Sequence, residues 1–229
     1  MSGFPKPLKT EVMGGVRKVI AGNMKQSLSN SAQLSFHIDV DINDATAKRK
    51  ELSRSIDITL SITDLMLKAC ADTLTKIPQI NTVISGDKVY FFDKVNIGLA
   101  VAVEHGLVVP VIKDVQRKSL SQIALERNGL VKKAKQGKLM PDELVGGTFT
   151  LTVLGIVDGF TPILNPGQSA ILGVGRVNKK PVVMGDEVVV REMVSLSLTV
   201  DHQVVDGVPA VNFLRRLKQT LEMPKALFK

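Results

Sequence analysis

The 229-residue chain has one cysteine, no tryptophan and one tyrosine, and these shortages exclude several classes of protein. A single cysteine, Cys70, excludes an internal disulfide framework and a zinc site built from cysteines. No run approaches 18 uncharged apolar residues, and the first fifteen residues hold no stretch that could act as a signal sequence. With 44% hydrophobic and 23% charged residues, the composition is typical of a globular domain. We expect an intracellular protein, cytoplasmic or, in a eukaryote, in the mitochondrial matrix, with no membrane association.

Positive charge is in excess, with 30 Lys and Arg against 22 Asp and Glu and a net charge of +8. The basic residues are spread along the chain, without the interleaved aromatic residues that single-strand nucleic-acid binders use for stacking. Nucleic-acid binding is therefore not expected. A small ligand that carries several phosphates is compatible with the charge.

Three familiar sequence signatures are absent as well. The chain holds no GxxxxGK[ST] phosphate loop, no GxGxxG dinucleotide fingerprint and no GxSxG nucleophile elbow. Nucleotide hydrolysis, hydride transfer and α/β-hydrolase chemistry therefore have no support in the sequence.

Hydrophobic periodicity predicts one α/β domain over residues 12–229. Residues 1–11, with Pro5 and Pro7 among lysines, are expected to be a linker or arm. Asn43 or Asp44 is expected to cap the second helix. Helices and strands mix without a strict β-α-β order, so we expect a two-layer fold in which helices pack on one side of a mixed sheet. The expected helices cover residues 15–28, 45–55, 61–77, 119–135 and 207–223, and the expected strands cover 34–42, 80–84, 88–92, 96–103, 107–112 and parts of 148–200.

The three histidines and the cysteine differ in what their surroundings indicate. His37, on the polar side of a strand, and His105, in an EHG turn, are expected to be ordinary surface residues. Cys70 lies on an apolar helix face and is expected to be buried and inert. His202 stands between an alternating strand and a helix, where an imidazole could face a cleft and take a proton from a thiol near neutral pH. Its residue type alone fits a structural histidine equally well.

The heptad from Asp201 to Gly207, DHQVVDG, resembles the DHRxxDG signature of the dihydrolipoamide acyltransferases, the core components of 2-oxo acid dehydrogenase complexes. Four further segments resemble the catalytic domain of this family in the same order. The likeness covers about residues 12 to 229. The segments are GVRKVIAGNM, NIGLAVAVEHGLVVPVIKDVQRKSL, GGTFTLTVLG and PILNPGQSAILGVG.

The resemblance implies a chloramphenicol-acetyltransferase-like fold, trimers that assemble into a large hollow core, and active sites between two subunits. Coenzyme A would enter each site from one end, and the dihydrolipoyl arm of a separate lipoyl domain from the other. Both are substrates, and no metal is implied. The decarboxylase and dihydrolipoyl dehydrogenase of such a complex would bind through domains upstream of this sequence. Residues 1–11 would be a linker remnant.

The resemblance also implies roles for individual residues. His202 would be the general base that deprotonates the attacking thiol, and Thr152 would donate a hydrogen bond to the oxyanion of the tetrahedral intermediate. Asp206 would support the loop, with Arg17 as its ion-pair partner. Gln203 stands where the family has arginine, from which we expect altered loop support rather than lost catalysis.

The sequence leaves three questions open. The first is the acyl group: the resemblance associates a threonine at the position of Thr152 with succinyl-transferring relatives, whereas GGTFTL and EHGLVVP fit acetyl or branched-chain enzymes as well. An acetyl or branched-chain group is favoured over succinyl, and a succinyl pocket would need a cation for the distal carboxylate. A free-standing chloramphenicol-type O-acetyltransferase and a non-catalytic scaffold core are the alternative functions. The apolar C-terminal residues Leu227 and Phe228 are predicted to dock into a neighbouring trimer.

Overall fold

The structure is a computed structural model that describes residues 5–104 and 106–228. A six-stranded sheet forms its centre, in the order β1-β10-β9-β8-β4-β7. Neighbouring strands are antiparallel except for β9, β8 and β4, which run parallel to one another. The expected mixed sheet is therefore confirmed. The strands are β1 (Gln33–Asp41), β4 (Ile97–Leu99), β7 (Val111–Ile112), β8 (Phe149–Val153), β9 (Ala170–Met184) and β10 (Glu187–Asp201).

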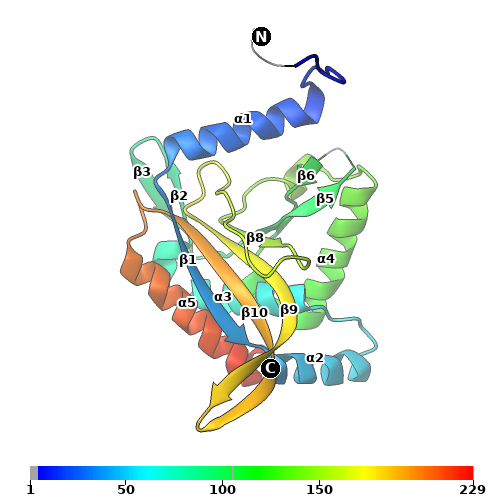
Figure 1. Ribbon diagram of the computed structural model, residues 1–229, viewed down its shortest axis with the longest axis vertical. Helices are drawn as coiled ribbons and strands as arrows, with labels where there is room; N and C mark the ends of the chain where they lie inside the picture. The colour runs from blue at the N-terminus through cyan, green and yellow to red at the C-terminus, as the bar shows by residue number, and fades with distance from the viewer. Residues whose placement is uncertain (1–4, 105, 229) are drawn as a thin grey trace.

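Four helices cover one face of this sheet and enclose a single hydrophobic core with it. They are α2 (Asn43–Ser55), α3 (Ile62–Leu74), α4 (Leu120–Lys135) and α5 (Gly207–Glu222). Figure 1 shows α3 and α5 behind β1 and β10, and it shows α1 (Gly15–Asn30) lying across one end of the molecule. The chain between β8 and β9 crosses the opposite face. The prediction of helices packed on one side is confirmed for the four core helices.

Helix ends explain one error in the sequence-based expectation. Ser61 and Ser119 begin α3 and α4 with reciprocal capping boxes, as their sequences favour. The prediction that Asn43 or Asp44 caps α2 is wrong, because α2 begins at Asn43 itself. The carboxylate of Asp41 accepts a hydrogen bond from the Asn43 backbone N–H at 2.9 Å, so the cap comes from the preceding strand.

The two long strands expected at 96–103 and 107–112 are each interrupted. Their outer parts, β4 and β7, stay in the main sheet, whereas β5 (Val101–Val103) and β6 (Gly106–Val108) form a separate hairpin. Pro110 lies between β6 and β7 and has no N–H to continue a ladder, which accounts for the break. A second small hairpin joins β2 (Thr82–Ser85) to β3 (Lys88–Phe91).

The sheet face opposite the helices carries polar cross-strand pairs. The Ser35 and Thr199 hydroxyls lie 2.8 Å apart, and His37 Nδ1 lies 2.8 Å from the Ser197 hydroxyl. The expectation that His37 is an ordinary hydrogen-bonded surface residue is confirmed. His105 lies outside the described residues.

Two further sequence-based expectations concern buried residues. Cys70 is fully buried in α3, and burial raises the pKa of its thiol well above the ordinary range, which confirms that it is an inert core residue. Leu227 is only 1% exposed and packs into the core of its own chain, with Phe228 against it. The prediction that Leu227 docks into a neighbouring trimer is therefore wrong for this arrangement, because its side chain packs in its own chain, whereas the docking of the partly buried Phe228 stays a prediction.

A buried ion pair joins α3 to α4, and its loss should be costly. Asp64 is 0% exposed and accepts two hydrogen bonds from Arg127, at 2.6 and 3.1 Å. Asp64→Ala leaves the guanidinium without its partner, so we expect the free energy of unfolding in urea to fall by about 3–5 kcal/mol. Asp87→Ala, in an exposed turn, should change it by less than about 0.5 kcal/mol. Equal effects of the two substitutions would contradict this assignment.

Candidate active site

The segment that carries His202 is a tight turn between β10 and α5. The backbone N–H of His202 donates to the Ala32 carbonyl at 2.8 Å, and the N–H groups of Val204 and Val205 donate to the Asp201 carbonyl at 3.0 and 2.8 Å. These bonds fix the backbone on both sides of the imidazole, whose side chain remains 47% exposed. The structure therefore presents His202 at a strand end, as its sequence context predicts.

Asp206 lies beside His202 at the start of α5. Its Oδ1 is 3.5 Å from His202 Nδ1, and its side chain is 83% exposed. At this distance the carboxylate lies close to the ring without a hydrogen bond to it in the described part of the chain. No ion pair joins Asp206 to Arg17 within the described residues, so the expected pairing of these two residues is not found in this chain.

Two neighbours of His202 carry contacts that the sequence reasoning missed. Asp201 is buried and accepts hydrogen bonds from Ala32 and from Gln203, and the Gln203 side chain also reaches the end of α1. The signal for Asp201 was present, because an acidic residue that directly extends a buried strand needs donors around it. Ala32, which contacts Asp201, and Asn30, which contacts Gln203, lie 169 and 173 residues away in the sequence and could not be identified from it.

Thr152 lies in β8 and lines a pocket of about 280 Å³ on the sheet face opposite the helices. Thr150 lines the same pocket, but its hydroxyl is taken by Gln168 at 2.6 Å and Asn165 at 2.7 Å. The Thr152 hydroxyl forms no hydrogen bond with another side chain or backbone group in the described part of the chain. Of the two threonines, Thr152 is therefore the one that can donate to a ligand.

The walls of this Thr152 pocket are mostly apolar. They include Leu107, Val109, Phe160 and Ile163, and no charged residue lines the pocket in the described ranges. Phe160 lies so close to β9 that a Cβ on Gly173 would come within 3.1 Å of its ring. The absence of a side chain at this glycine lets the loop after β8 lie close against the sheet.

The structure does not bring His202 and Thr152 together within one chain. Thr152 pairs with Gly173, which pairs with Ser197, so Thr152 lies two strands from β10. Asp201 is four residues beyond Ser197, about 14 Å further along the strand, and two strand spacings add about 10 Å across the sheet. His202 and Thr152 of the same chain are therefore too far apart to act on the same thioester.

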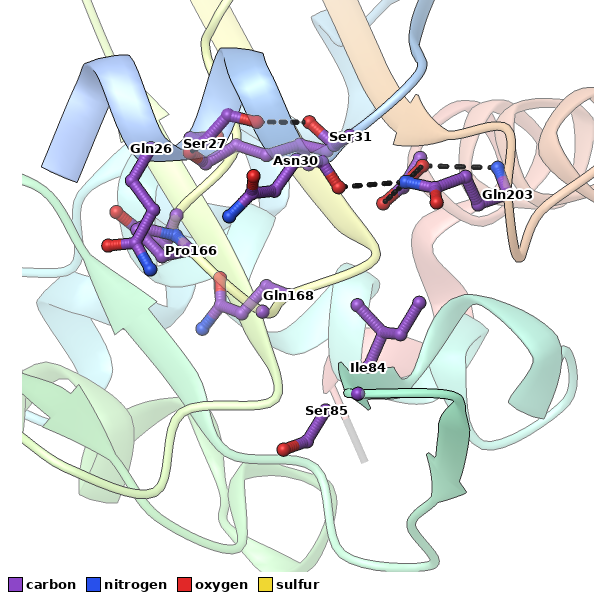
Figure 2. Close-up of a pocket in the computed structure, with 14 residues that line it drawn as sticks. Gln26, Ser27, Asn30, Ser31, Ile84, Ser85, Pro166, Gln168 and Gln203 are labelled. Atoms are coloured by element: carbon purple, nitrogen blue, oxygen red, sulfur yellow. Dashed lines mark hydrogen bonds between the residues drawn. The ribbon is translucent and has the colours of Figure 1, made fainter.

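A second cleft, of about 480 Å³, is lined by Gln203 and by the end of α1 (Figure 2). Gln26 and Asn30 of α1, Ser85 of the β2–β3 hairpin and Gln168 contribute polar side chains to it, and Asp201 is its one ionisable lining residue in the described ranges. His202 does not line this cleft, whereas its neighbours Asp201 and Gln203 do. The imidazole therefore lies outside this cleft.

Within the described ranges, no helix has the length and apolar character needed to cross a bilayer. In the same residues, His, Cys, Asp and Glu side chains form no group of three or more that could hold a metal ion.

Comparison with known proteins places the chain in a family. Residues 5–229 match the family model for the catalytic domain of 2-oxoacid dehydrogenases acyltransferase. A dihydrolipoyllysine-residue acetyltransferase component of the acetoin cleaving system of Bacillus subtilis is 41% identical over 93% of this chain and 55% of its own length. A lipoamide acyltransferase component of the B. subtilis branched-chain alpha-keto acid dehydrogenase complex is 40% identical over 91% and 51%. An Arabidopsis thaliana dihydrolipoyllysine-residue succinyltransferase component is 37% identical over 97% and 50%. The chain thus spans about half the length of these relatives.

Solved structures agree with this placement. The dihydrolipoamide acetyltransferase of Azotobacter vinelandii and the cubic core of a pyruvate dehydrogenase complex each superpose with a TM-score of 0.91, at 33% identity over 100% of both chains. A chloramphenicol acetyltransferase superposes with a TM-score of 0.55 at 14% identity, over 87% of this chain and 94% of its own, which confirms the expected fold. The chain belongs to the family of 2-oxo acid dehydrogenase acyltransferase catalytic domains.

Proposed function

We propose that this domain transfers an acyl group between the thiol of a dihydrolipoyl group and coenzyme A. The observation that carries the proposal is that the chain presents both residues that the reaction needs, in separate places. His202 is half-exposed beside Asp206, and the Thr152 hydroxyl lies in an apolar pocket without a hydrogen-bond partner among the described residues. The A. vinelandii enzyme, the subject of an investigation of catalytic roles, has a histidine and an asparagine four residues apart, as are His202 and Asp206 here. A serine precedes them, as Thr152 precedes His202.

The proposed reaction needs one base and one hydrogen-bond donor. The His202 imidazole takes the proton of the attacking thiol, whose sulfur then adds to the carbonyl carbon of the thioester. The Thr152 hydroxyl donates to the oxygen that becomes negative in the tetrahedral intermediate. When the intermediate collapses, the carbon–sulfur bond to the second thiol breaks, and the imidazolium returns its proton to that sulfur.

The active site is proposed to form between two copies of the chain. The large separation of His202 and Thr152 within one chain supports this arrangement, because a neighbouring copy can bring its own His202 to this Thr152 pocket. Head-to-tail contacts of this kind close into rings, and a trimer is the expected ring. Assembly of trimers into a larger hollow core is supported by the close superposition on the cubic core.

The acyl group is proposed to be neutral, acetyl or branched-chain, rather than succinyl. The Thr152 pocket has apolar walls and no charged lining residue in the described ranges, so a cation for a distal carboxylate would have to come from the neighbouring copy. The relatives include acetyl-, succinyl- and branched-chain-transferring components and so do not distinguish between these acyl groups. The preference for a neutral group rests on the residues that line the pocket. A lipoyl domain, a decarboxylase and a dihydrolipoyl dehydrogenase are the proposed partners.

Transfer to dihydrolipoamide from acetyl-, isobutyryl- and succinyl-coenzyme A tests the proposal. We expect transfer from at least one neutral donor, at a rate per site at least about tenfold above that from succinyl-coenzyme A. Acylation of an alcohol such as chloramphenicol in preference to the thiol would favour a free-standing O-acetyltransferase. An assembled protein that transfers from no donor would favour a scaffold core.

A further inference from the structure

A buried carboxylate without a cationic partner lies directly beside His202. Asp201 is 1% exposed, and no Lys, Arg or His of the described ranges forms an ion pair with it. An ionised carboxylate in this position is stable only if N–H groups surround it. The donors are the backbone N–H of Ala32 at 3.1 Å, the backbone N–H of Gln203 at 3.1 Å, and Gln203 Nε2 at 3.2 Å from Oδ1 and 3.3 Å from Oδ2.

The same Gln203 amide makes a second contact. Its Nε2 donates to the carbonyl of Asn30, the last residue of α1, at 2.8 Å (Figure 2). The last carbonyls of a helix have no partner within the helix, so they need an outside donor. A single side-chain NH₂ group therefore joins the buried Asp201 carboxylate to the end of α1.

These contacts hold residues 201–203 against residues 30–32. Asp201 and Gln203 are held to Asn30 and Ala32 through their side chains, and the N–H of His202 between them donates to Ala32. The direction of the His202 ring thus depends on where the end of α1 lies.

Helix α1 is in turn fixed beside the Thr152 pocket of its own chain, which belongs to a different shared site from the one that this His202 serves. The Ser27 hydroxyl donates to the Leu164 carbonyl at 2.6 Å, and Met24 lines the Thr152 pocket. The helix therefore contacts the His202 turn at one point and the Thr152 pocket at another.

We propose that Gln203 is a positioning residue for His202, which acts by tying the turn to the C-terminal end of α1 through its side-chain amide. This inference rests on the proposed function, since the direction of the ring affects the rate only if His202 is the base. Gln203 needs its two N–H donors for this role, and its charge is not required. An arginine, which the family carries here, also supplies several donors.

Three variants test the role in the assembled protein. Gln203→Glu keeps the size of the side chain but replaces the donating NH₂ by an acceptor beside Asp201. We expect kcat to fall about tenfold or more, as misplacement of a catalytic group does, with KM for coenzyme A within about twofold. Gln203→Arg should keep kcat within about threefold of the unmodified protein, because the donors return. Gln26→Glu adds the same charge to the same cleft, where Gln26 makes no side-chain hydrogen bond to any described residue, and should leave kcat unchanged.

Amide hydrogen exchange of residues 198–205, together with particle size, completes the test. Exchange should be faster in Gln203→Glu only, with the assembly intact. Unchanged kcat in Gln203→Glu, an equal fall in Gln26→Glu, failure of Gln203→Arg to restore kcat, or loss of assembly in Gln203→Glu would each overturn the positioning role. Absence of transfer by the unmodified protein would instead contradict the proposed function, and the exchange rates would still test the tie to α1.

Discussion

Replacement of His202 by alanine is expected to lower kcat for acyl transfer by about a thousandfold, within the range for loss of a general base. The thiol of coenzyme A or dihydrolipoamide is mostly protonated at neutral pH, so attack on the thioester depends on a base within reach. His202 has the exposure and the Asp206 contact that this role needs, and its removal takes no side chain from the core. The measurement is the rate of dihydrolipoamide acylation with the preferred donor.

His37→Ala is the matched control for this substitution. It removes an imidazole from an exposed position whose contact is the Ser197 hydroxyl, and it should leave the rate within about threefold. The His202 backbone N–H, which bonds Ala32, remains in the alanine variant, so the turn should keep its shape. A rate for His202→Ala close to that of the unmodified protein would remove His202 from the mechanism.

Replacement of Thr152 by valine is expected to lower kcat by about a hundredfold, as does loss of one oxyanion donor in other enzymes. Valine keeps the shape of threonine and suits a strand, but it has no hydroxyl to stabilise the tetrahedral intermediate. The hydroxyl contributes most in the transition state, so KM should change little. The measurement is steady-state kinetics with coenzyme A as the varied substrate.

Thr75→Val provides the control, because its exposed hydroxyl donates to the Asp72 carbonyl at the end of α3 and has no other partner among the residues that the structure describes. It should leave kcat unchanged. An unchanged kcat in Thr152→Val, or a rise in KM with kcat retained, would show that Thr152 serves in substrate binding at most.

The sequence was sufficient for the architecture of the sheet and the core helices. Alternation in β1 and β10 and helical spacing in α3 and α5 are strong signals, because the apolar residues of each element recur on the side that faces the core. The break at Pro110 was harder to predict, because whether a proline sits at an edge or inside a ladder depends on strands distant in the sequence. The cap of α2 by Asp41 depended on where β1 ends.

The site could be predicted only in part. The position of His202 at a strand end follows from the local pattern, but the free hydroxyl of Thr152 becomes apparent only once Gln168 and Asn165 are seen to occupy Thr150. The tie of Gln203 to Asn30 spans 173 residues of sequence. Contacts of this kind arise when segments distant in the sequence pack together, so the hydrophobic periodicity of each segment does not predict them.

The central claim is that one chain supplies His202 and another supplies Thr152 to each active site. Co-assembly of His202→Ala with Thr152→Val, with a different tag on each and purification by both tags, tests it directly. Sites that combine His202 of one variant with Thr152 of the other are intact. A trimer ring that holds both variants has one such site of three, so activity should return to about a third of that of the unmodified protein, or about a quarter where rings form at random within a larger core. Mixed assemblies no more active than their two parents would contradict the shared site.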